Sequence, residues 1–203
     1  MSISPRLNKH FALAAVATAA VAATANASVV TWNANLLIPN NIDGYYINVE
    51  TQVYATHQDL VTGWDLNPYG TSTTTMSWFA AQAPSGCVMG TGQGGLTNAV
   101  ASLSAGTLVS SANTFSNTAS SVSAGGWMLN SANYFGFRFL GADALTHYGF
   151  GQMTVGATMG VRTLNYVSFQ TTAGLGITIP AIPAPGALAL LGLAGFATRR
   201  RRA

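Results

Sequence analysis

Alternation of apolar and polar residues is the sequence feature that most restricts how this chain can fold. Three segments show it most clearly: residues 44–49, 134–139 and 163–171. Because successive side chains of a strand point to opposite faces of a sheet, a period of two puts Phe135, Phe137 and Phe139 on one face. In residues 163–171 the same rule puts Val167 and Phe169 on one side, with Leu164 and Tyr166 on the other. These segments are predicted to be strands with one buried face.

Other strand candidates, separated by glycine and Asn-Pro turn signals, are residues 29–33, 51–56, 73–79 and 147–155. Between the two ends of the chain no segment has a convincing helical stripe, and the best attempt, residues 96–103, is weak. The pattern predicts an all-β domain over residues 28–176, an antiparallel β-sandwich of jelly-roll type. Residues 101–126, rich in Ser, Ala, Thr, Asn and Gly, are either a long loop or short polar strands. Residues 177–185 are predicted to be a spacer.

Charge is scarce and unevenly placed along the chain. Only 6% of the residues are charged, against about 25% in an average soluble domain. Six of the eight basic residues lie near the two termini, which leaves Arg138 and Arg162 against five acids and a net charge of −3 for the middle. Nucleic-acid binding needs a basic stripe, so we expect no nucleic-acid partner.

The first 27 residues have the composition of a secretory signal peptide. Arg6 and Lys9 provide a positive start, and the apolar run that follows is short for a membrane span. Ala25 and Ala27 then form the small-x-small pattern that signal peptidase accepts. We expect an N-terminal signal helix over residues 1–27 and a mature chain that begins at Ser28. An N-terminal membrane anchor is the alternative.

The last 21 residues combine two prolines, an apolar run and an arginine cluster. Pro183 and Pro185 precede about 13 apolar residues, and Arg199, Arg200, Arg201 and Arg202 follow them. A helix of that length measures roughly 20 Å, shorter than a bilayer core of about 30 Å. The arginines would hold its end on the cytoplasmic side, and the prolines would keep the preceding stretch extended for a protease.

This order of parts over residues 182–203 resembles the PEP-CTERM sorting signal, which has a Pro-Glu-Pro motif, a short apolar helix and a terminal arginine cluster. Ala184 replaces the Glu in the motif Pro183-Ala184-Pro185. The resemblance implies transient anchoring in the inner membrane through a transmembrane sorting helix over residues 186–203. It also implies cleavage by an exosortase-type protease and delivery to the cell surface or extracellular matrix. An ordinary C-terminal anchor with a basic stop is the alternative. Four short motifs between the termini, at residues 44–49, 63–67, 136–139 and 147–150, also resemble domains that often accompany this tail. Domains of this type have no settled activity.

No catalytic constellation is recognisable in the middle of the chain. Its acids and the histidines His57 and His147 lack the spacing of a carboxylate pair or a nucleophile–His–acid site. Residues 90–95 contain the letters of a dinucleotide loop, but no helix is predicted after them. The single cysteine, Cys87, is expected to be a small buried or inert residue in a turn, and a disulfide with another chain is the alternative. We therefore expect no enzyme and no metal centre, with a secreted hydrolase as the last-ranked alternative.

The segment around Trp64 is the best candidate for ligand binding. An exposed tryptophan can stack on a sugar ring, although each aromatic ring of the chain can equally fill the core. Asp65 and Asn67 have the spacing of the first two oxygens of a calcium loop, but Tyr69 and Met76 break the rest of that pattern. An Asx-type turn capped by Asp65 and Asn67 is the structural alternative. The sequence thus favours an exported structural or adhesive surface protein without a cofactor. The alternative is a carbohydrate-binding module, calcium-assisted, with exopolysaccharide as its partner.

Overall fold

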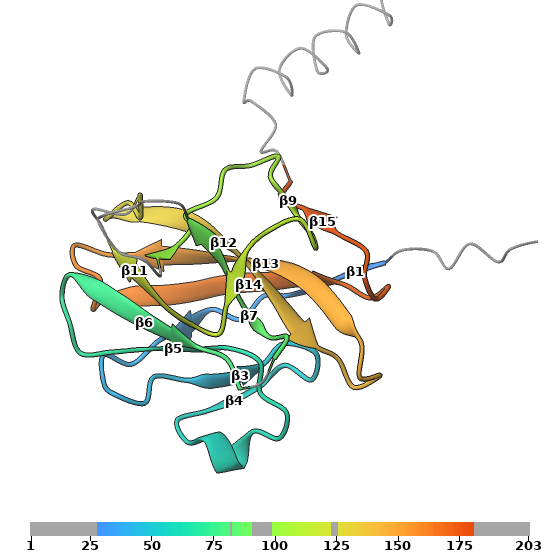
Figure 1. The fold of residues 1–203 in the computed structure, drawn as a ribbon. Coiled ribbons are helices and arrows are strands. Elements are labelled where there is room, and N and C mark those ends of the chain that lie inside the picture. The colour runs from blue at the N-terminus through green and yellow to red at the C-terminus, as the bar shows by residue number, and fades with distance from the viewer. Residues whose placement is uncertain (1–27, 82, 91–98, 123–125, 181–203) are drawn as a thin grey trace, which may run out of the picture.

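Strands make up nearly all the regular structure in the computed structural model, which describes residues 28–81, 83–90, 99–122 and 126–180 (Figure 1). Within these ranges the one helical element is a short 3-10 turn, η1 (Gln58–Leu60). The expectation of an all-β domain is therefore confirmed. The signal helix over residues 1–27 and the sorting helix over residues 186–203 lie outside the described residues.

The strands follow one another in this order: β1 (Val29–Trp32), β2 (Leu36–Leu37), β3 (Tyr46–Asn48), β4 (Val53–Ala55), β5 (Asn67–Tyr69), β6 (Thr75–Phe79), β7 (Gly86–Gly90), β8 (Ala99–Val100), β9 (Leu108–Val109), β10 (Phe115–Ser116), β11 (Thr118–Val122), β12 (Ser131–Leu140), β13 (Thr146–Val155), β14 (Arg162–Gln170) and β15 (Ile177–Thr178). All seven segments predicted from alternation contain a strand, namely β1, β3, β4, β6, β12, β13 and β14. Of the two alternatives for residues 101–126, the structure shows short strands, because β9, β10 and β11 all lie there.

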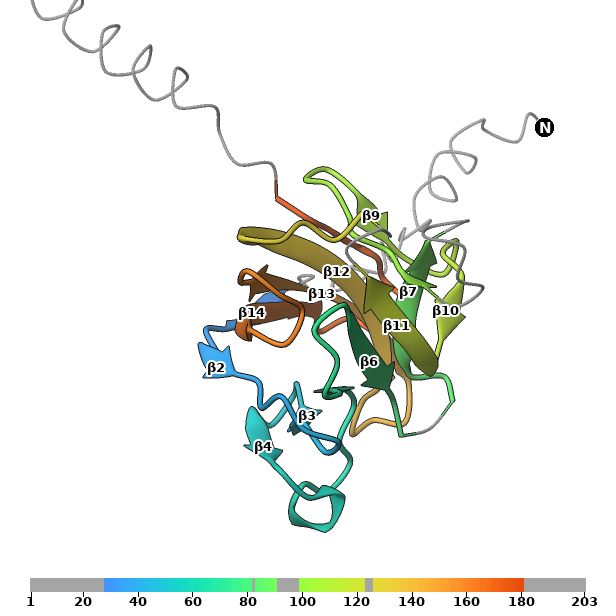
Figure 2. The same cartoon turned by 90° about the vertical axis from the view of Figure 1, so that its left-hand side faces the viewer.

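One 11-stranded sheet dominates the fold, with the order β1-β14-β13-β12-β7-β8-β11-β6-β5, while β10 pairs with β7 and β2 pairs with β14. Most pairs are antiparallel, but β8 and β11 pair in parallel, so the sheet is mixed. The expected antiparallel sandwich of two separate sheets is therefore not confirmed. Instead the sheet curls, and the wing made by β5, β6 and β11 faces the wing made by β12, β13 and β14 (Figure 2).

A large apolar core joins the two wings. The ring centroid of Trp78 on β6 lies 4.7 Å from that of Phe135 on β12 and 6.0 Å from that of Trp127. Both buried indoles have hydrogen-bond partners: Trp78 Nε1 donates to Ser121 Oγ at 2.6 Å, and Trp127 Nε1 donates to the Val100 carbonyl at 2.9 Å. Because a buried indole N–H needs an acceptor, these two bonds hold the tryptophans in place.

Glycines on β13 make room for the phenylalanines of β12. Phe135 pairs with Gly151 across the strands and Phe137 pairs with Gly149. A Cβ atom on either glycine would lie 2.4 Å from Cζ of the ring opposite. The expected face of Phe135, Phe137 and Phe139 is confirmed, since all three are at most 1% exposed.

Because of a β-bulge, the side chains of β14 lie on different faces from those predicted. Val167 pairs with Gly151, Tyr166 with Gln152 and Leu164 with Met153, so the register shifts between Gln152 and Met153. An extra residue in one strand reverses the alternation beyond it. Leu164 therefore joins Val167 and Phe169 in the core, while Tyr166 alone keeps the opposite face.

A second, smaller core covers the other face of β12 and β13. It contains Val109 of β9, Ile177 of β15 and Ile179, which pack against Tyr148 and Phe150 of β13. The domain thus continues to Ile179, past the expected boundary at residue 176, and the predicted spacer begins as strand β15. Pairing with β9 and the burial of Ile177 and Ile179 explain the difference.

Two strands lie where the sequence predicts turns. Cys87 lies in β7, where it is buried and pairs with Phe137 of β12. Asn67 and Pro68 lie in β5, at the end of the sheet order, where proline is tolerated because one side of the strand needs no partner. Part of the weak helical candidate at residues 96–103 is also extended, as β8.

Candidate functional site

Three aromatic rings meet at the surface around Trp64. The Trp64 centroid lies 5.0 Å from that of Tyr46 on β3 and 5.6 Å from that of Phe79 on β6. Trp64 and Tyr46 are half-buried, and Phe79 is 38% exposed. Partial burial, with a smaller contribution from Asp43, raises the pKa of the Tyr46 hydroxyl above its ordinary 10.0. We call Tyr46, Trp64 and Phe79 the Trp64 cluster.

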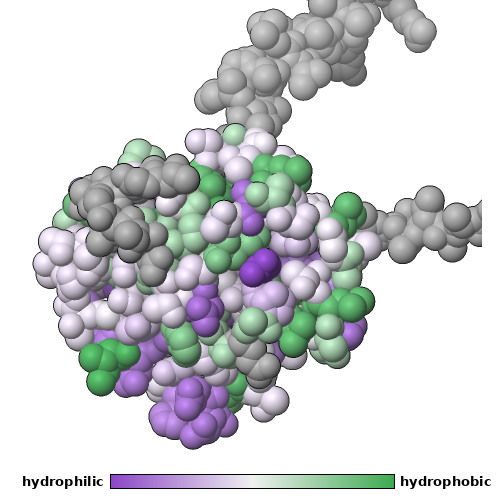
Figure 3. Space-filling model, viewed as in Figure 1, coloured by the Kyte–Doolittle hydropathy of each residue, from purple (hydrophilic) through white to green (hydrophobic). Residues whose placement is uncertain are grey.

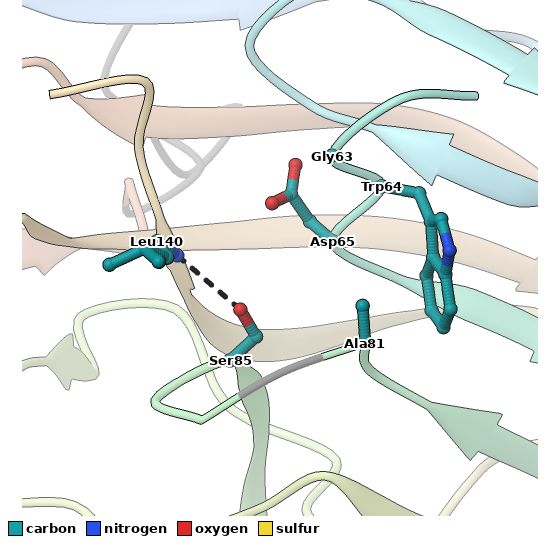
Figure 4. A pocket seen from close by; sticks show the side chains of 6 residues that line it. All are labelled: Gly63, Trp64, Asp65, Ala81, Ser85 and Leu140. Carbon is teal, nitrogen blue, oxygen red and sulfur yellow. Dashed lines mark hydrogen bonds between the residues drawn. The ribbon is translucent and has the colours of Figure 1, made fainter. Parts of the chain in front are cut away.

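A pocket of about 140 Å³ adjoins this cluster, and the six residues that line it are shown in Figure 4. Trp64 and Asp65 reach it from the loop before β5, Ser85 from the residue before β7, and Leu140 from the end of β12. Ser85 Oγ accepts a hydrogen bond from the Leu140 amide at 3.3 Å (Figure 4). The pocket therefore combines an indole ring with one carboxyl and one hydroxyl group.

Asp65 is the unusual group of this pocket. Its side chain belongs to a residue only 3% exposed, and Oδ2 accepts a hydrogen bond from the Val49 amide at 2.9 Å. Burial raises the pKa of this carboxyl from 3.8 to about 7; the Val49 hydrogen bond opposes the rise and nearby Glu50 adds to it. A good fraction of Asp65 therefore carries a proton at neutral pH and can donate a hydrogen bond.

Asn67, by contrast, does not line the pocket. It is 3% exposed, and its Nδ2 donates to the carbonyl oxygens of Asp43 at 2.6 Å and Tyr45 at 3.0 Å. These bonds fix the chain that leads into β3. Asn67 thus stabilises the backbone before β3 and does not share the pocket with the carboxyl group of Asp65. Among the residues that the structure describes, no group of three or more His, Cys, Asp or Glu side chains is arranged to hold a metal ion.

A second pocket, of about 320 Å³, contains His147, Asp143 and Glu50. His147 Nδ1 lies 2.9 Å from the Gln170 carbonyl oxygen, and Nε2 lies 3.1 Å from both carboxylate oxygens of Asp143. The imidazole also stacks on Phe139, with centroids 5.4 Å apart. Both ring nitrogens of His147 thus lie beside oxygen atoms. The side chain connects β13 to the end of β14 and to Asp143 in the turn between β12 and β13.

Asp143 itself titrates at lower pH than an ordinary aspartate. The amide of Leu145, which donates to Oδ1 at 2.9 Å, is the largest cause of the lowered pKa, and His147 adds to it. Neither nitrogen of His147 faces a nucleophile, and Cys87 lies buried in β7 instead. The arrangement therefore suits a hydrogen-bonded hairpin tip more than acyl transfer.

Sequence reasoning finds Trp64 and Asp65 but misses Tyr46, Phe79 and Ser85. A signal for the first two was present in the alternation. Ile47 and Trp78 point into the core, so their neighbours Tyr46 and Phe79 must point outward. Single exposed aromatic residues are ordinary, but several that gather on one surface mark an interaction site. Ser85 carries no such mark, because it reaches the pocket through the pairing of β7 with β12.

Of the residues predicted for signal cleavage and for sorting, only Ser28 lies in the described ranges. Ser28 Oγ lies 2.8 Å from Thr171 Oγ1, and its carbonyl accepts from the Thr171 amide at 2.9 Å. Ala25, Ala27, the Pro183–Pro185 motif and the terminal arginines lie outside the described residues. Where the structure describes the chain, none of its helices has the length and apolar character needed to cross a membrane. Comparison of the chain with models of protein families, with curated proteins and with solved structures finds no match.

Proposed function

We propose that this chain is an exported, non-catalytic surface protein of structural or adhesive type, which holds carbohydrate at the Trp64 cluster. The observation that carries the binding role is the meeting of three partly exposed aromatic rings beside a pocket with two hydrogen-bonding groups. Ligand sites combine apolar and aromatic walls with a few placed polar groups. Sugar rings have both an apolar C–H face and hydroxyl groups, so they match this combination.

The contrast between the tryptophans supports a surface role for Trp64. Trp78 and Trp127 are at most 2% exposed, and their N–H groups have acceptors inside the core. Trp64 is half-buried, and its N–H has no hydrogen-bond partner among the described residues. Its indole thus offers a ring face and a donor to a ligand.

The character of the surface also supports adhesion. Figure 3 shows a face that is mostly pale, with strongly hydrophilic and strongly hydrophobic colours confined to small patches. Pale colours mark residues of intermediate hydropathy, such as the Ser, Thr and Gly residues that are frequent in the described ranges. Neutral polar groups of this kind suit contact with hydroxyl-rich polymers. We also propose that the curled sheet is a distorted jelly-roll-like sandwich, an architecture that includes lectins.

Binding is tested with the purified full-length chain and the producing cell's own exopolysaccharide, by affinity electrophoresis and calorimetry. We expect saturable binding that weakens at least tenfold in Trp64→Ala. Trp32→Ala is the matched control, because Trp32 is also half-buried but lies against Tyr54 instead. Equal loss in both variants, or no binding by the wild type, would refute the proposed site. A repeat with a calcium chelator tests calcium assistance, and undiminished binding there argues against it.

The route to the surface has a separate test. We propose that signal peptidase and an exosortase-type protease process the two ends, on the sequence features described above. The intact mass of the protein from its native envelope should then correspond to a chain that begins at Ser28 and has lost the residues after the Pro183–Pro185 motif. A mass that retains Arg199–Arg202 would favour a plain membrane anchor.

A further inference from the structure

We infer that the sugar-binding surface continues past Ser85 to Arg138, and that Arg138 binds the carboxylate of an acidic polysaccharide built from uronic acids. This inference rests on the proposed function and names its substrate class. The observations behind it are a third pocket, which contains Arg138, the contacts of the Arg138 guanidinium group and the charges of the domain.

The guanidinium group of Arg138 is held in a fixed place. Its Cζ lies 4.5 Å from the centroid of the Phe115 ring, and its Nε donates to the carbonyl oxygen of Pro84. Arg138 lies on β12 opposite Gly86 of β7. Phe115 belongs to β10, which also pairs with β7, and Pro84 lies in the loop before β7, so both contacts come from neighbouring parts of one sheet. Cation–π stacking and one hydrogen bond together restrict the rotation of the side chain. The group is thus preorganised.

The two terminal amino groups of this guanidinium have no hydrogen-bond partner in the part of the chain that the structure describes. The ion pairs found there involve His57 and His147, and neither involves Arg138. A guanidinium fork with both outer groups available matches the two oxygens of a carboxylate. Arg138 therefore has the donors that bidentate binding of a carboxylate requires.

Arg138 is also the more accessible of the two arginines in the described part of the chain. The other arginine between the termini, Arg162, is 1% exposed, and its two amino groups donate to backbone carbonyls. No lysine lies between residues 28 and 180. An anionic ligand that reaches this domain therefore has one arginine to which it can bind.

A pocket of about 250 Å³ surrounds the Arg138 group, and its walls include Ser85, Phe115, Ser116 and Asn117. None of its lining residues within the described part of the chain is acidic. Ser85 also lines the pocket beside Trp64. The two pockets thus share Ser85 as a lining residue, with the indole of Trp64 in one pocket and the guanidinium of Arg138 in the other.

This arrangement matches a polyuronate better than a neutral glycan. One sugar can lie on the Trp64 cluster while the carboxylate of another reaches Arg138. The acids of the domain oppose a polyanion, but at physiological salt their field is screened over about 8 Å. Among the acids in the described ranges, only Asp65 lines either of the two pockets.

The test compares binding of the full-length chain to polygalacturonate, to the same polymer after reduction of its carboxyl groups, and to a sulfated dextran. We expect the polyuronate to bind at least tenfold more tightly than the reduced polymer, with weakening at higher salt. Arg138→Gln should lower the affinity for polygalacturonate to that for the reduced polymer, while Arg138→Lys should keep part of the preference. Ser104→Glu changes the net charge equally at an exposed residue that lines neither pocket, and should keep the preference.

The outcomes separate the two proposals. Equal binding of the acidic and reduced polymers would overturn the role of Arg138 while the proposed function stands. No binding to either polymer or to the exopolysaccharide would overturn both. Sulfated dextran that binds as tightly as polygalacturonate would overturn the assignment to uronic acids, and loss of the preference in Ser104→Glu would show a general charge effect instead.

Discussion

Replacement of Asp65 by asparagine should change how the stability of the domain depends on pH. The pKa of Asp65 is raised from 3.8 to about 7 in the folded protein, so the folded state holds this proton more tightly than the unfolded chain does. The resulting stabilisation is fully present below about pH 4 and is lost as pH rises to about 7. A difference of this size corresponds to about 4 kcal/mol at 25 °C.

The asparagine side chain has nearly the same shape as the aspartate, and its carbonyl oxygen could still accept the hydrogen bond that the Val49 amide donates to Asp65. Because an amide does not ionise, the variant should be free of the penalty for a buried negative charge. We therefore expect Asp65→Asn to be up to roughly 4 kcal/mol more stable than the wild type at pH 8. The two proteins should converge towards pH 4.

Urea unfolding followed by tryptophan fluorescence, at one-unit steps from pH 4 to pH 8, measures this difference directly. Asp143, whose pKa is lowered, contributes equally to both proteins and cancels in the comparison. Asp59→Asn is the control, because its side chain is 75% exposed and its curve should run parallel to that of the wild type. Parallel curves for Asp65→Asn and the wild type would refute the reasoning, as would a variant less stable at every pH.

Three further predictions concern packing and the buried polar groups. Gly151→Ala brings a Cβ atom to 2.4 Å from the Phe135 ring and should lower the free energy of unfolding by about 1–3 kcal/mol in urea; an unchanged midpoint would contradict the close fit. Arg162→Met leaves three backbone carbonyls without their donor and should cost about 3–5 kcal/mol, measured as a lower Tm; an equal or higher Tm would contradict this. Burial raises the pKa of the Cys87 thiol, so it should react with a thiol reagent only in denaturant, and rapid labelling of the native protein would contradict its burial.

Alternation was a sufficient guide to the long strands of this fold. The segments around Phe137 and Val167 alternate and form the long strands β12 and β14, although the bulge in β14 brings Leu164 to the core face as well. The segment around Ile47 forms the three-residue strand β3. Strands β5 and β7 escaped prediction because Pro68 and the Pro84–Gly86 stretch have the residues of turns. The energy that makes these segments extended comes from pairing with β6 and β12, which lie elsewhere in the sequence.

In the candidate site, too, the features set by local sequence could be predicted, and those set by pairing with distant strands could not. Trp64 and Asp65 are neighbours in the chain, so their proximity could be predicted. Ser85 and Arg138 are brought beside them by the register of β7 on β12, which no local pattern encodes. Burial of Arg162 was also beyond prediction, because arginine is usually exposed, and only the fold supplies the three carbonyls around it.

The pairing of the first strand with the last long strand determines when this domain can be completed. Val29 of β1 lies opposite Gln170 of β14, and Trp32 lies opposite Val167. A chain that emerges gradually from a ribosome or a membrane pore, N-terminus first, must therefore wait for nearly all of its residues before β1 has a partner. Such distant contacts make folding slow. The arrival of β14 is thus the event that permits closure of the sheet, and until then β1 lacks its partner and the emerging chain stays incompletely folded.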